Sequence, residues 1–149
     1  MPIGEVCIRN VLVANRETTI REVLQLMRQH HVGDLVVVDA PNGRRIPTGI
    51  VTERDIVISV VATTLDPAIF TLGDLITQEL ITAKEDSGIA ESIQRMRFNG
   101  IRRMPIVDKE GGLVGIVTVD DLVRLLSEEL SDLSSVISHE QAREREKKR

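Results

Sequence analysis

The 149-residue sequence predicts an α/β protein of the mixed α+β kind, built from two βαββα repeats with a helical extension at the C-terminus. Internal repetition is the main observation, because residues 3–39 align without a gap on residues 72–108. The motif Gly-Ile-Val-Thr-x-x-Asp then occurs at 49–55 and again at 115–121. A repeat of about sixty residues is too short to bury a large core alone. We therefore expect the two repeats to pack together and to leave a cleft between them.

The first half of each repeat combines a strand, a helix and a buried strand. In the first repeat a short apolar strand is expected at 11–13. A stripe with the spacing of a one-sided helix follows, made of Ile20, Val23, Leu24 and Met27. Thr18 or Thr19 is positioned to cap that helix. The unbroken branched run at 35–38 is typical of a strand buried on both faces.

The second half of each repeat adds a strand and a helix. Turn residues at 39–47 end the buried strand, and a strand at 49–51 leads into a helix over about residues 53–61. Ile81 opens the second repeat. Its predicted elements are a helix with the stripe Ile89, Ile93 and Met96, strands at 104–107 and 114–117, and a last helix from Asp120.

The boundaries follow from where the repetition stops. The segment 62–68, which contains Pro67, is expected to link the repeats, so we predict one repeat at 1–64, a second at 65–127 and a C-terminal tail at 128–149. Apolar residues continue a helical stripe as far as Ile137, and almost only charged residues follow. This pattern favours a solvated helix or a frayed end over a binding arm.

Composition argues against a nucleic-acid binder. The chain has two Phe, no Tyr and no Trp, so it lacks the stacking platforms that single-stranded nucleic acids need. The formal net charge of −4 and the pI near 5.4 oppose a broad footprint on phosphate backbones. Nucleic acid is therefore not an expected partner.

The remaining composition predicts a cytoplasmic protein without a metal centre. Cys7 is the single cysteine and lies in an apolar stretch, so we expect a small buried side chain rather than a disulfide or a metal ligand. His30 and His31 end a predicted helix, where the helix dipole favours a cation. No apolar run reaches the roughly eighteen residues of a membrane span, and no basic segment precedes a short apolar one as in a signal peptide.

The repeated Thr-x-x-Asp motif has two interpretations. It stands where a strand runs into a helix, which is the place of a capping box. A carboxylate at the same place is also an acceptor for both hydroxyls of a ribose, and a helix N-terminus offers N–H groups and positive potential to a phosphate. Duplication alone does not decide between the two interpretations, because a duplicated domain duplicates its caps.

The segments His31–Asp39 and Gly49–Ile56, repeated as Gly100–Asp108 and Gly115–Leu122, resemble two cystathionine-beta-synthase (CBS) domains in tandem. The resemblance covers about residues 1–127. It implies two repeats related by a pseudo-two-fold axis, with two clefts for adenosine-containing ligands. In that family the motif Asp holds the ribose hydroxyls, the motif Thr or Ser lies near ribose or phosphate, and the other repeat clamps the adenine.

Carried over by position, the motif residues imply two sites, the first at Thr52 and Asp55 and the second at Thr118 and Asp121. The other repeat would supply the opposite walls: Ile81, Ile101, Arg102 and Arg103 for the first site, and Leu12, Val32 and Gly33 for the second.

The two repeats differ in charge at equivalent positions. Asp34 occupies the position of Arg103, and Arg54 occupies the position of Asp120 and points either at a phosphate or at solvent. By the geometry of the family, arginines face the first cleft and Asp34 faces the second. We therefore expect the first cleft to prefer AMP, ADP or ATP, and the second to stay empty or to take a less negative ligand.

We interpret the protein as a regulatory binding module rather than an enzyme. The sequence has no Walker-type loop, no His-Glu-x-x-His run and no Gly-x-Ser-x-Gly elbow, and no catalytic cofactor is expected. The expected function is to sense an adenine nucleotide and to signal to a separate effector protein, as a homodimer formed through exposed helices. The alternatives are a sensor of S-adenosylmethionine or NAD, a structural dimer whose motifs are only caps, and a nucleic-acid binder that uses the basic tail.

Overall fold

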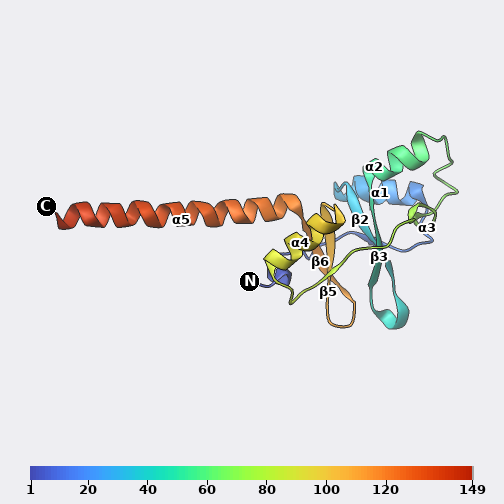
Figure 1. Cartoon of the computed structure of the whole chain (residues 1–149). Helices are drawn as coiled ribbons and strands as arrows, with labels where there is room; N and C mark the ends of the chain where they lie inside the picture. The colour runs from blue at the N-terminus through green and yellow to red at the C-terminus, as the bar shows by residue number, and fades with distance from the viewer. Residues whose placement is uncertain (149) are drawn as a thin grey trace. The chain divides into compact units, whose positions relative to one another are not determined.

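The computed structural model describes residues 1–148 of the chain (Figure 1). The chain divides into two compact units, Met1–Val117 and Thr118–Arg149. The first unit contains nearly all of both repeats, and the second consists of one long helix. Among residues 1–148, no helix combines the length and the apolarity that crossing a membrane requires.

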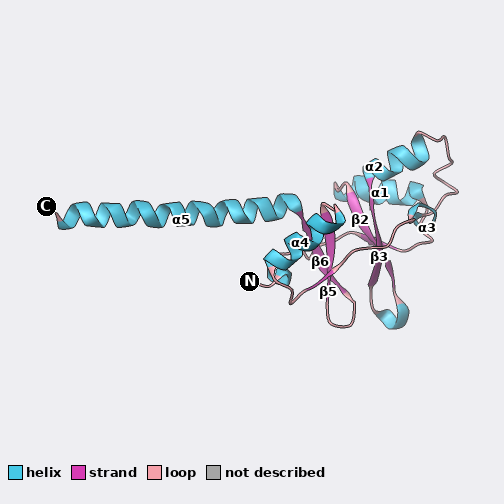
Figure 2. Cartoon of the chain, in the orientation of Figure 1, coloured by secondary structure: helices cyan, strands magenta, loops and turns pink. Residues whose placement is uncertain are grey.

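The first repeat forms a three-stranded sheet in the order β1-β2-β3. Strand β1 (Val13–Ala14) runs parallel to β2 (Asp34–Asp39), and β2 runs antiparallel to β3 (Ile46–Thr52). Helix α1 (Ile20–His30) connects β1 to β2 and begins at Thr19, whose hydroxyl accepts the Glu22 N–H at 3.3 Å. The predicted helix and its cap at Thr19 are confirmed. Strands β2 and β3 contain the predicted strands at 35–38 and 49–51 (Figure 2), whereas β1 overlaps the strand predicted at 11–13 only at Val13.

The second repeat forms a sheet of the same kind, in the order β4-β5-β6. Its strands are β4 (Ala83–Lys84), β5 (Arg103–Val107) and β6 (Leu113–Thr118), with helix α4 (Ile89–Asn99) between β4 and β5. Strand β4 runs parallel to β5, as β1 does to β2. The sheets confirm the predicted α/β class and the repetition.

Short helices complete the described chain. They are the 3-10 turns η1 (Ile3–Glu5) and η2 (Pro41–Gly43), the helix α2 (Glu53–Ile56), the π-helical turn η3 (Val57–Val61) and the helix α3 (Leu72–Leu75). The helix predicted over 53–61 is therefore an α-helical turn followed by a π-helical one. The second unit is α5 (Val119–Lys147), so the charged tail continues as helix.

The branched run in β2 is buried on both faces, as predicted. Leu35 and Val37 belong to one apolar cluster with α1, whereas Val36 and Val38 pack in another with Ile116 of β6. Alternate residues of a strand point to opposite faces. One face of β2 therefore closes the core of its own repeat, and the other joins it to the second repeat.

The repeats also exchange their first residues. The Ile3 N–H donates to the Ser87 carbonyl at 2.7 Å, and the equivalent Leu72 N–H donates to the Thr18 carbonyl at 3.0 Å. Ile3 and Leu72 are completely buried, and Leu72 belongs to the core cluster of the first repeat. Each repeat thus depends on a residue that precedes the other. Cys7 lies beside this exchange and is partly buried, which raises the pKa of its thiol.

Two equivalent glycines in these segments offer a stability test. A Cβ on Gly4 would lie 2.8 Å from the Glu85 Cβ and 2.9 Å from the Glu85 carbonyl oxygen. A Cβ on Gly73 would lie 3.4 Å from the Arg16 Cβ and 3.4 Å from the Arg16 carbonyl oxygen. We expect Gly4→Ala to lower the free energy of unfolding by about 1 to 3 kcal/mol. Gly73→Ala should change it by less than about 0.5 kcal/mol. Urea denaturation measures both, and equal losses would contradict this account of the exchange.

Candidate functional site

The first unit contains a pocket of about 380 Å³ that is lined by residues of both repeats, which we call the Asp55 pocket. Its walls come from β3 and the start of the following helix, from the segment 75–81 that leads to β4, and from the segment 101–103 at the start of β5. The volume lies within the range of small-molecule sites, about 300 to 1,000 Å³. The lining residues are Gly49, Ile50, Val51, Asp55, Ser59, Leu75, Ile76, Thr77, Gln78, Glu79, Leu80, Ile81, Ile101, Arg102 and Arg103.

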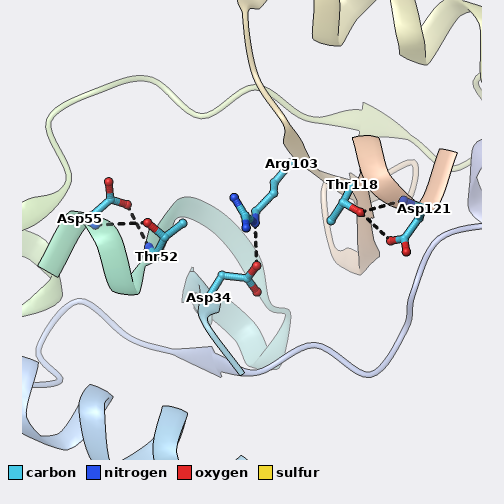
Figure 3. A network of polar contacts seen from close by, with 6 residues as sticks. All are labelled: Asp34, Thr52, Asp55, Arg103, Thr118 and Asp121. Carbon is cyan, nitrogen blue, oxygen red and sulfur yellow. Dashed lines mark hydrogen bonds and ion pairs between the residues drawn. The ribbon is translucent and has the colours of Figure 1, made fainter. Parts of the chain in front are cut away.

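Asp55 takes part in a cap and also lines the pocket. The Thr52 N–H donates to Asp55 Oδ2 at 2.9 Å, and the Asp55 N–H donates to Thr52 Oγ1 at 3.2 Å (Figure 3). These two bonds form a capping box at the N-terminus of α2. Within residues 1–148, Oδ1 of Asp55 accepts no hydrogen bond. The cap therefore leaves one carboxylate oxygen available to a ligand.

A second capping box in the same unit shows what a cap alone looks like. The Thr71 N–H donates to Asp74 Oδ2 at 3.0 Å, as in the box at Thr52. Asp74, however, is not among the residues that line the Asp55 pocket. The capping interpretation is thus correct for the motif at Thr52, and the pocket distinguishes Asp55 from Asp74.

The opposite wall of the pocket carries two arginines, Arg102 and Arg103. Arg103 Nε donates to Asp34 Oδ2 at 2.7 Å in an ion pair, and both side chains are partly exposed (Figure 3). Asp34 and Arg103 occupy equivalent positions in the two repeats, so the pair joins the repeats near their approximate symmetry axis. The resemblance placed Asp34 at the second cleft, but Asp34 contacts a residue of the first.

The structure brings together most of the predicted first site. Asp55, Ile81, Ile101, Arg102 and Arg103 all line the pocket. Thr52 and Arg54 do not, and Arg54 is exposed. Sequence reasoning missed Ser59 and the segment 75–80, including Glu79. The sequence offers one indication that this segment lines the pocket, namely that it directly precedes Ile81, a predicted wall residue.

The motif of the second repeat, at Thr118 and Asp121, has a different set of hydrogen bonds from the motif at Thr52 and Asp55. The Asp121 N–H donates to Thr118 Oγ1 at 3.2 Å, and the Thr118 hydroxyl donates to Asp121 Oδ2 at 2.8 Å (Figure 3). Oδ1 of Asp121 lies 3.7 Å from Arg124 Nη1. Both carboxylate oxygens of Asp121 thus have a partner. Thr118 and Asp121 belong to the second unit, while the residues predicted to face them, Leu12, Val32 and Gly33, belong to the first, so the second cleft stays a prediction.

The described side chains form no cluster of metal ligands, and the absence of a metal centre stays a prediction. Within residues 1–148, no group of three or more His, Cys, Asp or Glu side chains is arranged to hold a metal ion. The polar side chains that line the Asp55 pocket, among them Asp55, Arg102 and Arg103, can form hydrogen bonds and ion pairs.

Comparison with known proteins identifies the family. The model of the CBS domain matches residues 3–62 and again residues 72–128. The chain therefore belongs to the CBS domain family, and it contains a pair of these domains. Such pairs are regulatory modules that bind ligands.

Relatives and solved structures agree with the family match. An uncharacterized protein of Methanopyrus kandleri is 40% identical over 123 residues, which cover 83% of this chain and 61% of that protein. The chain thus spans less than two thirds of that relative. Hypoxic Response Protein I, solved with two coordinated zinc ions, is similar with a TM-score of 0.72 and 29% identity over 83% of this chain and 98% of that one. A CBS domain pair in complex with 5′-methylthioadenosine and S-adenosyl-L-methionine has a TM-score of 0.71 and 26% identity, covering 87% of this chain and 98% of that one.

Proposed function

We propose that the Asp55 pocket binds an adenosine-containing ligand of the AMP, ADP or ATP class, and that ligand binding is signalled to a separate effector protein. One observation carries the proposal: Asp55, whose Oδ1 accepts no hydrogen bond within residues 1–148, lines the same pocket as Arg102 and Arg103. A carboxylate accepts from ribose hydroxyls, and arginines bind phosphate. The apolar side chains of Ile81 and Ile101 would then cover the base.

S-adenosylmethionine is the second candidate ligand. A structurally similar CBS pair was solved with S-adenosyl-L-methionine and 5′-methylthioadenosine, both of which contain adenosine. Glu79 in the lining of the Asp55 pocket adds a negative charge that suits a sulfonium cation. NAD, which also contains adenosine, is the third candidate ligand. We propose a binding role for the pocket and no catalytic one.

We also propose that the protein is a homodimer that associates through exposed helices of its repeats. Val57, Ile58 and Val61 of η3 expose more than half of their surface, and Phe98 of α4 is 90% exposed. Apolar side chains gathered on a surface mark an association site more often than single ones do. These residues are the ones to change first in a search for the interface.

The experiment that tests the ligand class is a thermal-shift series with adenosine, AMP, ADP, ATP, NAD and S-adenosylmethionine. A ligand that binds only the folded state stabilises it by about 2.7 kcal/mol at 100 times its Kd. We expect the nucleotides with phosphate groups to raise the midpoint most, and guanosine monophosphate to serve as the matched control. A midpoint that none of the adenosine compounds changes would refute the proposed function and favour a structural dimer.

A further inference from the structure

Helix α5 has an exposed apolar stripe that no proposed function uses. We call it the α5 seam, and its residues are Val123, Leu126, Leu130, Leu133 and Ile137. Their side chains are between 44% and 68% exposed. Such an exposed row of aliphatic side chains on one helix requires a physical explanation.

The spacing of the seam is that of a coiled coil. Successive seam residues lie three, four, three and four residues apart, which is a heptad repeat with a mean period of 3.5. A helix that packs on a globular core has a wider apolar face with a period of 3.6. The narrow seam therefore fits another helix with the same repeat, and α5 of a second copy is such a helix.

The residue types at the seam indicate the number and direction of the helices. Val123, Leu130 and Ile137 occupy the a positions, and Leu126 and Leu133 occupy the d positions. β-Branched residues at a with leucine at d favour a parallel pair of helices. Two of the three a residues are β-branched, and both d residues are leucine. In a parallel pair Glu129 at g would face Ser134 at e of the second copy, so no like charges meet beside the seam.

The seam ends where charge begins. The next d and a positions after Ile137 are Glu140 and Glu144, which would bring like charges together in a parallel pair. We propose that two copies of the chain pair in parallel through the α5 seam, from Val123 to Ile137, while the charged residues beyond it stay apart.

The size of the seam predicts a reversible association. A fully buried branched side chain removes roughly 60 to 120 Å² of apolar surface from water. Five half-exposed side chains on each helix therefore bury about 500 Å² in a pair, before flanking contacts. This is below the roughly 1,200 Å² of a standard stable interface. Pairing should thus depend on protein concentration, or on a second interface that holds two copies together.

Disulfide trapping in the full-length chain tests the pairing and its direction. In a Cys7→Ser background, Leu133→Cys places a thiol at a d position of the seam, and Ser135→Cys places one on the opposite side of the helix at an f position. Matched d positions lie opposite each other only in a parallel pair in register. We expect the thiol at position 133 to form covalent dimers at least about tenfold faster, a factor that corresponds to 1.4 kcal/mol. Equal rates, or a faster reaction at position 135, would overturn the proposal.

Sedimentation equilibrium provides the second measurement. Leu130→Asp with Leu133→Asp should weaken self-association at least about tenfold. The matched control, Ser131→Asp with Ser135→Asp, adds the same charge outside the seam and should leave association unchanged. A chain truncated after Ser138 should associate like the full chain, because the seam ends at Ile137. Loss of association on that truncation would contradict the proposed pairing through the α5 seam, and so would an equal effect of both double variants. Ligand titrations of the same variants are expected to be unchanged, so this test is independent of the proposed function.

Discussion

Replacing Asp55 with Asn should weaken binding of adenosine ligands to the Asp55 pocket by about 1 to 3 kcal/mol, or roughly 5- to 150-fold in Kd. The amide of Asn keeps an oxygen for the Thr52 N–H, so the capping box is largely preserved. It loses the negative charge and presents an N–H₂ group, which cannot accept a bond from a ribose hydroxyl. Isothermal titration calorimetry with AMP measures the change.

The matched control for this prediction is Asp74→Asn. Asp74 accepts the Thr71 N–H at the start of α3 as Asp55 accepts the Thr52 N–H, but it does not line the pocket. Both variants should lose a similar amount of stability, about 0.5 to 2 kcal/mol at most, because both weaken a cap. Only Asp55→Asn should change the affinity for AMP. Unchanged titrations for Asp55→Asn and for Asp121→Asn together would show that both motifs are caps and nothing more.

The repeat and its elements were predictable because their signals are local. The spacing of Ile20, Val23 and Met27 predicts α1, and all three residues are buried. The helix over 53–61 was predicted without its π-helical turn, because Ile56 and Val60 face the core in either case. Helix α3 is four residues long, too short for an apolar period to show. The exchange of Ile3 and Leu72 was not predicted, since it depends on packing between segments far apart in the sequence.

The site was predictable where it coincides with the repeated motif and unpredictable elsewhere. Asp55, Ile101 and Arg102 lie at positions that the repeat marks. The segment 75–80 contains no motif, so its contribution to the pocket follows only from the path of the chain. The pair between Arg103 and Asp34 did have a signal: equivalent positions near a symmetry axis approach each other, and these two carry opposite charges.

Replacing both Arg102 and Arg103 with Ala should remove the proposed preference of the Asp55 pocket for ligands with phosphate groups. Hydrogen bonds to charged groups contribute about 1.5 to 3 kcal/mol each, so the affinity for AMP should fall at least about tenfold. Adenosine, which has no phosphate, is the control ligand, and its affinity should change little. If AMP and adenosine are weakened equally, the arginines maintain the shape of the pocket and do not recognise phosphate.

The ion pair between Arg103 and Asp34 makes this prediction sharper. Asp34 Oδ2 accepts the Arg103 Nε–H at 2.7 Å, so it competes with a ligand phosphate for the same guanidinium group. Asp34→Asn keeps the shape of the side chain but removes the competing charge. Since the pair is partly exposed and screened by solvent, the gain should be modest, about 1 kcal/mol or roughly fivefold in the affinity for AMP. The gain should shrink at high salt and disappear in an Arg103→Ala background, because the competition requires the arginine.

A gain that persists without Arg103 would mean that Asp34 repels the phosphate directly, as expected for a residue at the second cleft. Calorimetric titration of the double variant therefore decides which of the two clefts Asp34 controls.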